Sequence, residues 1–205
     1  MICIVDYGMG NIGSIQNMLN KLGAHSIISS DPEVIEDASQ LILPGVGHFQ
    51  RGMERLVELN LVDLLNKKVL VDRIPSLGIC LGMQLMGKLS EEGNSAGLGW
   101  FDAEFKKFDL QKTNYPIKVP CIGWNEVTLK KSSKLFEGID QPRFYFVHSY
   151  HAVCNQSSEI LAEAEYGYKY TAAYEKENIY GVQFHPEKSH KYGLQLFQNF
   201  ITFCK

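Results

Sequence analysis

Residues 74–87 read IPSLGICLGMQLMG, and this stretch decides the fold. An apolar run leads into Gly78, Cys80 and Gly82, and apolar residues at helical spacing follow. A buried strand that turns sharply into a helix is typical of a nucleophile elbow. Glycines around the turn let the cysteine adopt a strained backbone, and the helix N-terminus behind it favours a thiolate. The stretch therefore predicts an α/β fold with Cys80 as a candidate nucleophile.

The residues before and after this turn alternate between strand and helix patterns. We expect strands at residues 2–6, 25–29, 40–43 and 74–79, separated by helices at residues 12–22, 49–67 and 81–89. From about residue 98, aromatic and β-branched segments predict antiparallel or mixed strands at residues 99–105, 117–122, 125–129, 143–150, 159–164, 170–174 and 179–184. A closing helix is expected from about residue 191. The order predicts a mixed, mostly parallel central sheet flanked by helices, with a smaller antiparallel sheet in the C-terminal half, as one domain over residues 1–205.

Composition excludes several classes of function. The chain has 205 residues, of which 45% are hydrophobic, and a formal net charge of -3. No run of basic residues suggests nucleic acid, and no apolar stretch is long enough to cross a membrane. Five widely spaced cysteines without a C-x-x-C pair indicate a reducing compartment, so we expect a cytoplasmic protein.

A cysteine nucleophile needs a base, and His185 is the candidate. It lies in YGVQFHPEKS, where an apolar strand ends at residues 185–187. Alternation along a strand puts His185 and Glu187 on the same side, so the carboxylate can orient the imidazole. A solvated histidine at a strand end is the alternative. His148 and His151 also lie three residues apart, but no further ligand at a known spacing supports a metal site, and we expect no metal.

The first glycines of the chain offer a competing hypothesis. Gly8, Gly10 and Gly13 form a G-x-G-x-x-G between a strand pattern and a helix pattern, and Asp31 follows a second apolar stretch. These are the parts of a dinucleotide site, in which the acidic residue binds the ribose. The alternative function would be a dinucleotide-binding oxidoreductase module.

Further motifs carry a resemblance to a known family. GICLGMQ (78–84) and FHPEK (184–188) resemble the triad-type, class I glutamine amidotransferases. DYGMGN (6–11), PGVG (44–47), SEEG (90–93), GWN (123–125), YFVHSY (145–150) and FHPEKS (184–189) are similar to the glutaminase subunits of imidazole glycerol phosphate synthases. The resemblance implies hydrolysis of glutamine to glutamate and ammonia, without a cofactor. It further implies that ammonia passes to a synthase (cyclase) subunit, a hetero-oligomer partner that makes imidazole glycerol phosphate and AICAR in histidine biosynthesis.

Roles in this reaction fall on a small set of residues. We expect Cys80 to be the nucleophile, His185 the base and Glu187 the carboxylate that orients it. The Leu81 N–H and the loop around Val46 are expected to hold the oxyanion. The resemblance implies that five further residues bind the glutamine substrate, Glu92 through its α-ammonium group: Gly47, Gln84, Glu92, Ser149 and Tyr150.

The resemblance also implies a partner-binding surface, and it places the glycines of residues 8–13 there instead of at a cofactor. Its contact residues are Asn11, Trp124, Asn125 and Lys188. The family usually has a histidine before GWN, whereas Cys121 and Ile122 stand here. Two alternatives therefore stay open: a glutaminase companion of a surface-sugar amidotransferase, and a non-catalytic scaffold, against which the complete triad argues.

Overall fold

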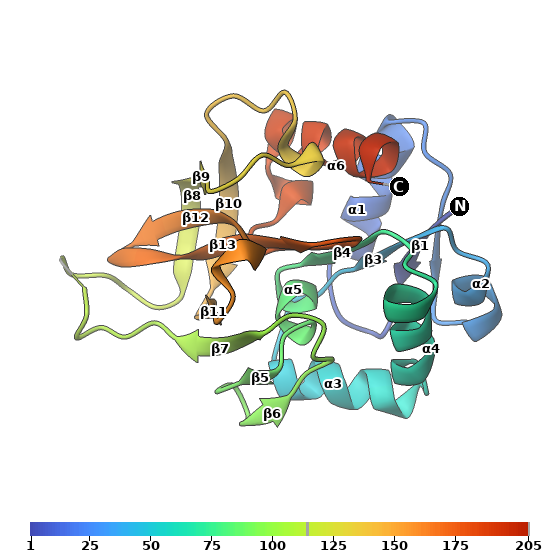
Figure 1. Cartoon of the computed structure of the whole chain (residues 1–205), viewed down its shortest axis with the longest axis horizontal. Coiled ribbons are helices and arrows are strands. Elements are labelled where there is room, and N and C mark those ends of the chain that lie inside the picture. The colour runs from blue at the N-terminus through green and yellow to red at the C-terminus, as the bar shows by residue number, and fades with distance from the viewer. Residues whose placement is uncertain (114, 205) are drawn as a thin grey trace.

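The computed structural model describes residues 1–113 and 115–204. A large mixed sheet runs through its centre, with helices on both faces (Figure 1). Five strands form its parallel part in the order β2-β1-β3-β4-β14: β1 (Ile2–Val5), β2 (Ser26–Ser29), β3 (Gln40–Leu43), β4 (Ser76–Ile79) and β14 (Ile179–Val182). β14 comes from the far end of the chain and completes this part beside β4, as the parallel register of Tyr180 with Leu77 shows.

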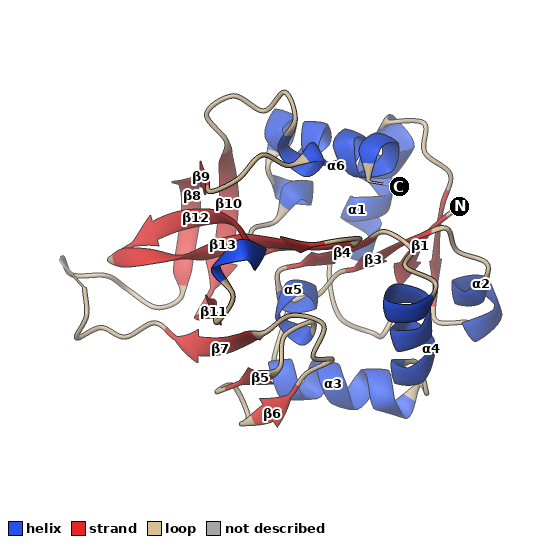
Figure 2. Cartoon of the chain, in the orientation of Figure 1, coloured by secondary structure: helices blue, strands red, loops and turns tan. Residues whose placement is uncertain are grey.

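The rest of the large sheet is mostly antiparallel. It continues from β14 through β13 (Tyr168–Lys176), β11 (Tyr150–Cys154), β7 (Ala103–Lys107), β5 (Leu89–Ser90) and β6 (Ser95–Ala96). Off this path, β12 (Ile160–Tyr166) pairs with β13, and β9 (Thr128–Leu129) pairs with β12. A separate antiparallel pair is formed by β8 (Cys121–Glu126) and β10 (Arg143–His148). The predicted mixed sheet with a smaller antiparallel sheet in the C-terminal half is confirmed (Figure 2).

Two hydrophobic clusters hold the helices to the sheet. α1 (Ile12–Lys21) and α6 (His190–Phe203) pack on one face, and α2 (Pro32–Glu36), α3 (Phe49–Glu58), α4 (Val62–Asn66) and α5 (Leu81–Leu85) pack on the other. Alternate residues of β1 serve opposite faces, since Ile4 lies in the first cluster and Val5 in the second. The strand is thus buried on both sides, as in other parallel sheets. No helix among the described residues is long and apolar enough to cross a bilayer.

Several expected elements have different bounds. The helix predicted at residues 49–67 is broken at Asn60, which has a φ of +56°, and a π-helical turn (Lys67–Val71) follows α4. The helix predicted at residues 81–89 ends at Leu85. The segments predicted at 117–122 and 125–129 form mainly one strand, β8, and the strand predicted at 179–184 ends at Val182. α2 was not expected from the sequence.

Candidate active site

Three neighbouring parallel strands end at one edge of the sheet, and each leads into a segment of the site. β3 is followed by residues 44–47, β4 by Cys80, and β14 by residues 183–187. Ligand sites in parallel sheets lie beyond the carboxyl ends of the strands. The sheet order therefore brings together segments that are widely separated in the chain.

The turn at Cys80 is the sharp elbow that the sequence predicts. Cys80 has a φ of +53°, which is rare for a residue other than glycine and stores backbone strain. Both flanking glycines are required by close packing. A Cβ on Gly82 would lie 1.7 Å from the carbonyl oxygen of Leu43, and one on Gly78 would lie 2.8 Å from the backbone of Met83.

His185 and Glu187 lie side by side, as the sequence predicts, but for a different reason. Nδ1 of His185 is 2.8 Å from Oε1 of Glu187, and both side chains are buried. Because β14 ends at Val182, strand alternation does not align the pair. Glu187 lies instead in the 3-10 turn Pro186–Lys188, which brings its carboxylate to Nδ1 of His185. The Ser189 hydroxyl stabilises this turn by donating to the His185 carbonyl at 2.6 Å.

The electrostatic surroundings favour a charged imidazole. Burial by itself lowers the pKa of His185, but the charge of the adjacent Cys80, together with Glu187, raises this pKa to about 10. Nε2 of His185 is buried and unsatisfied by the other described side and main chains. The arrangement suits a proton exchange between the thiol of Cys80 and the imidazole.

A pocket of about 240 Å³ opens at Cys80. It is lined by every residue that the sequence assigned to the oxyanion or to glutamine: Val46, Gly47, Leu81, Gln84, Glu92, Ser149 and Tyr150. Three further lining residues were not predicted: Pro120, Val147 and His148. No sequence signal identified Pro120 or Val147, whereas His148 lies within the YFVHSY motif.

Glu92 has a structural contact as well as a place in this pocket. Its Oε2 accepts a hydrogen bond from the Phe49 N–H at 2.8 Å, at the first turn of α3. A carboxylate is favourable at a helix N-terminus because the free N–H groups there carry partial positive charge. The second oxygen of Glu92 remains available to a cationic group in the pocket.

The loop of residues 44–47 carries the exposed Val46 and lies against the elbow. The Leu81 N–H, one of the predicted oxyanion donors, donates to the Gly45 carbonyl at 3.3 Å. Gly47 has a φ of +123°, and Val46 is 41% exposed. The Gly45 carbonyl of the loop thus accepts the hydrogen bond of an N–H that is expected to bind the oxyanion.

Gly10, in the glycine turn of residues 8–13, packs on this loop, which gives that glycine a role other than nucleotide binding. A Cβ on Gly10 would lie 3.2 Å from the backbone of Gly45, so two backbones approach closely there. The Tyr7 hydroxyl donates to the Pro44 carbonyl. Asp31, the residue expected to bind a ribose, caps α2 by accepting from the Glu33 N–H at 2.9 Å. These contacts leave the dinucleotide alternative without a structural basis.

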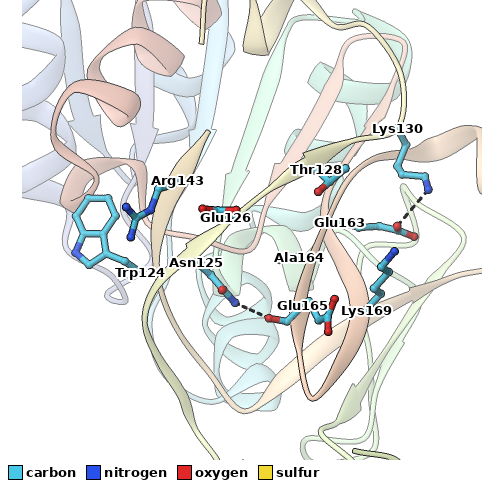
Figure 3. Close-up of a pocket in the computed structure, with 10 residues that line it drawn as sticks. All are labelled: Trp124, Asn125, Glu126, Thr128, Lys130, Arg143, Glu163, Ala164, Glu165 and Lys169. Atoms are coloured by element: carbon cyan, nitrogen blue, oxygen red, sulfur yellow. Dashed lines mark hydrogen bonds and ion pairs between the residues drawn. The ribbon is translucent and has the colours of Figure 1, made fainter. Parts of the chain in front are cut away.

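The four predicted partner-contact residues are not equally free. Asn11 and Lys188 are exposed, and the Lys188 Nζ lies 5.8 Å from the centre of the Tyr145 ring. Trp124 is 40% exposed and stacks on His190, with ring planes 4° apart. Asn125 instead donates to the Glu165 carbonyl at 2.8 Å within a pocket of about 430 Å³ (Figure 3).

The two histidines at 148 and 151 belong to an aromatic cluster. Both contact the ring of Phe108, and burial lowers the pKa of His148 to about 3. Over residues 1–113 and 115–204, no group of three or more histidine, cysteine, aspartate or glutamate side chains is arranged to hold a metal ion.

Known proteins share both the sequence and the fold. The family model described as glutamine amidotransferase class-I matches residues 3–203. The chain is 53% identical to the imidazole glycerol phosphate synthase subunit HisH 2 of Methanococcus maripaludis and 48% identical to the subunit of that name from Pseudomonas aeruginosa, covering 98% of each chain in both cases. A crystal structure of a glutamine amidotransferase superposes with a TM-score of 0.75 at 18% identity over 100% of this chain and 99% of the other, a likeness of fold alone.

Proposed function

The chain belongs to the class I glutamine amidotransferases, and we propose that Cys80, His185 and Glu187 hydrolyse glutamine within an imidazole glycerol phosphate synthase. The observation that carries this assignment is the meeting of the Cys80 elbow and the buried His185–Glu187 pair beside a pocket of about 240 Å³. The active complex would work in the cytoplasm, because all five cysteines are free thiols.

The reaction begins at the sulfur of Cys80. The thiol proton passes to Nε2 of His185, and the thiolate attacks the side-chain amide carbon of glutamine. His185 then gives the proton to the leaving nitrogen, which departs as ammonia and leaves a γ-glutamyl thioester on Cys80. Water, deprotonated by His185, cleaves the thioester and releases glutamate. Glu187 fixes the imidazole with Nδ1 as donor, so that Nε2 faces the sulfur.

The residues that line the pocket bind the substrate and the oxyanion. Glu92 pairs with the α-ammonium group of the substrate, while Gly47, Gln84, Ser149 and Tyr150 line the space for the rest of the molecule. The oxyanion receives the Leu81 N–H and an N–H from the loop at Val46, once the Gly45 carbonyl has moved away from Leu81.

The ammonia is used by a cyclase subunit that docks beside the pocket. Exposed Asn11, Trp124 and Lys188 are the contacts we assign to this partner. Asn125 supports the surface indirectly, since its side chain is bound to the Glu165 carbonyl. A docked partner keeps ammonia from protonation in bulk water.

The test is reconstitution of the two-subunit enzyme. The chain is co-purified with its cyclase subunit, and glutamate release and cyclised product are measured with glutamine as the nitrogen source. We expect glutamate and product in a 1:1 ratio that disappears in Cys80→Ala. Glutamine-dependent synthesis that persists in Cys80→Ala would overturn the triad assignment.

A second partner that would accept the ammonia is tested in a parallel experiment. The reason is Ile122, which lies at the proposed partner surface. Ile122 is 59% exposed and lies two residues from Trp124 on β8, so both side chains are on one face of the strand. Cys121 and Ile122 stand where the family usually has a histidine before GWN, and this departure keeps open the alternative partner, a surface-sugar amidotransferase. Stable co-purification with such a synthase, and none with the cyclase, would transfer the same glutaminase chemistry to the other acceptor.

A further inference from the structure

Gln183 is fully buried, and its side chain reaches the candidate nucleophile. It follows β14 directly, and its backbone N–H donates to the Ala172 carbonyl at 2.8 Å. Its side-chain Nε2 lies 3.7 Å from Sγ of Cys80, although the two residues are 103 positions apart. The distance is within the range of a hydrogen bond to sulfur.

The neighbouring side chains determine which end of the Gln183 amide faces the sulfur. Nε2 of Gln84 lies 3.3 Å from the Tyr150 carbonyl, which can only accept, so this atom must be the amino group of Gln84. The same amino group lies 3.2 Å from the other end of the Gln183 amide, which must therefore be its carbonyl oxygen. The amino group of Gln183 is left pointing at Cys80.

His148 fixes the far end of this network. Its Nδ1 donates to the Tyr150 carbonyl at 2.8 Å, and its Nε2 accepts from the Tyr170 hydroxyl at 3.3 Å. Burial lowers the pKa of His148 to about 3, so the ring stays neutral and keeps this tautomer. His148 and Gln84 therefore both donate to the Tyr150 carbonyl, and from Gln84 the donors point through Gln183 to Cys80.

We propose that Gln183 is a further catalytic residue, whose amide N–H donates a hydrogen bond to the Cys80 thiolate and stabilises it for attack. The inference rests on the proposed function. The thiol and the thiolate have different partners: the thiol donates to the Val147 carbonyl, 3.9 Å from Sγ, and the thiolate accepts from Gln183. The thiolate lies near the charged imidazole of His185 and the carbonyl oxygen of Val147, and a hydrogen-bond donor to the buried sulfur stabilises it further, because a buried charge is costly unless it is hydrogen-bonded.

The same side chain links the nucleophile to the substrate pocket. Its carbonyl oxygen accepts from Gln84, which lines the glutamine pocket, so the donor to sulfur and a wall of the pocket share one hydrogen-bond network. A change at Gln183 is therefore expected to reduce kcat through the thiolate, with a smaller rise of KM through Gln84.

The test measures the reactivity of Cys80 without glutamine. The full chain is alkylated with iodoacetamide from pH 5 to pH 10, and the rate at each cysteine is read by peptide mass spectrometry. Gln183→Met keeps the size of the side chain and removes its donor. We expect alkylation of Cys80 at pH 7 to fall about tenfold, with the midpoint of the profile about one pH unit higher.

Gln40→Met is the matched control. Gln40 is also buried and donates to the carbonyls of Phe200 and Cys204. It is the first residue of β3, so it lies at the amino ends of the parallel strands, whereas Cys80 lies beyond their carboxyl ends. We expect it to leave the Cys80 profile unchanged while losing a similar amount of thermal stability. Unchanged alkylation of Cys3 and Cys121, which are buried, reports in each sample that the fold is intact.

A second measurement needs no substitution. The ¹⁵N and ¹H resonances of the Gln183 side-chain amide in the wild-type chain should move with the same midpoint as the alkylation of Cys80. If Gln183→Met leaves the profile unchanged, or if the amide resonances do not follow it, the inference is wrong. Because neither readout involves glutamine, a failure of the proposed function would appear separately, as a shifted profile in a chain that releases no glutamate even when its cyclase partner is present.

Discussion

The Leu81 N–H donates a hydrogen bond to the Gly45 carbonyl at 3.3 Å. In a nucleophile elbow, the N–H of the residue after the nucleophile is one of the two oxyanion donors. The loop of residues 44–47 therefore competes with the transition state for this donor. Activity requires the loop to move away from Leu81, and two of its residues, Gly45 and Gly47, give its backbone the freedom to do so.

The isolated chain is accordingly expected to be a poor glutaminase that its partner activates. One missing oxyanion donor costs on the order of 10²–10³ in rate, so a partner that favours the donating loop should raise kcat about a hundredfold or more. The KM for glutamine should change less. Steady-state glutamate release is measured for the chain alone, with the partner, and with partner plus acceptor substrate. Full activity of the isolated chain would contradict the gating, and an effect on KM alone would move the switch to the glutamine pocket.

A glutamine analogue should label one cysteine. 6-Diazo-5-oxo-norleucine enters the glutamine pocket and alkylates a nucleophile there, and of the five cysteines only Cys80 lines that pocket. Burial raises the pKa of the thiols of Cys121 and Cys154 to about 11, which makes them unreactive at neutral pH. Intact-mass analysis should show one adduct, and peptide mapping should place it on Cys80. Label on Cys121 or Cys154 with Cys80 free would be evidence against the triad.

The two half-reactions should separate in Cys80→Ala. The substitution removes the nucleophile but leaves the partner's own site intact. The variant complex is expected to lose glutamine-dependent synthesis and to retain synthesis from added ammonium salt at the wild-type rate. Size-exclusion chromatography checks that the complex has formed. Loss of both activities in an intact complex would mean that Cys80 also serves the synthase reaction.

The buried imidazole should make stability depend on pH. Burial lowers the pKa of His185, but the larger opposite effect of Cys80 and Glu187 raises this pKa from the ordinary value of 6.5 to about 10. The folded chain then keeps a proton that the unfolded chain releases, so the stabilisation is complete below about pH 6.5 and is lost as the pH rises through about 10. Urea unfolding should show a falling free energy of unfolding over this range.

Glu187→Gln is the matched comparison for this pH dependence. Without the carboxylate the pKa of His185 is raised less, so the loss of stability between pH 6.5 and 10 should be smaller than in wild type. Burial also raises the pKa of the Cys3 and Cys204 thiols to about 11, but that contribution is common to both proteins and cancels. Equal slopes for the two proteins would show that the charged pair does not form.

Glu92→Gln should separate charge from helix capping. The amide oxygen can still accept from the Phe49 N–H, which keeps the start of α3, but it cannot pair with an ammonium group. KM for glutamine should rise roughly tenfold or more with kcat little changed. Glu91→Gln is the control, because Glu91 binds the Lys107 N–H and does not line the pocket. A fall of kcat without a rise of KM would argue against this role of Glu92.

The sequence by itself determined the local parts of this site. The Cys80 elbow is visible because glycines flank it within five residues, and the His185–Glu187 pair because Pro186 lies between its members. Such features depend on backbone geometry over a few residues, which residue types report directly. The alternating first half likewise predicted the parallel sheet, although the break at Asn60 and the early end of β14 did not follow from periodicity.

Only the tertiary structure decided how these parts meet. The bond between Leu81 and Gly45 and the contact of Gln183 with Cys80 exist because β3, β4 and β14 lie side by side. Strand order is set by packing of helices and loops over the whole chain, and no local pattern encodes it. The glycines at residues 8 and 10 also show that a local pattern does not reveal a tertiary contact. Their spacing indicated a nucleotide site, but close approach to Gly45 is what the fold requires of Gly10.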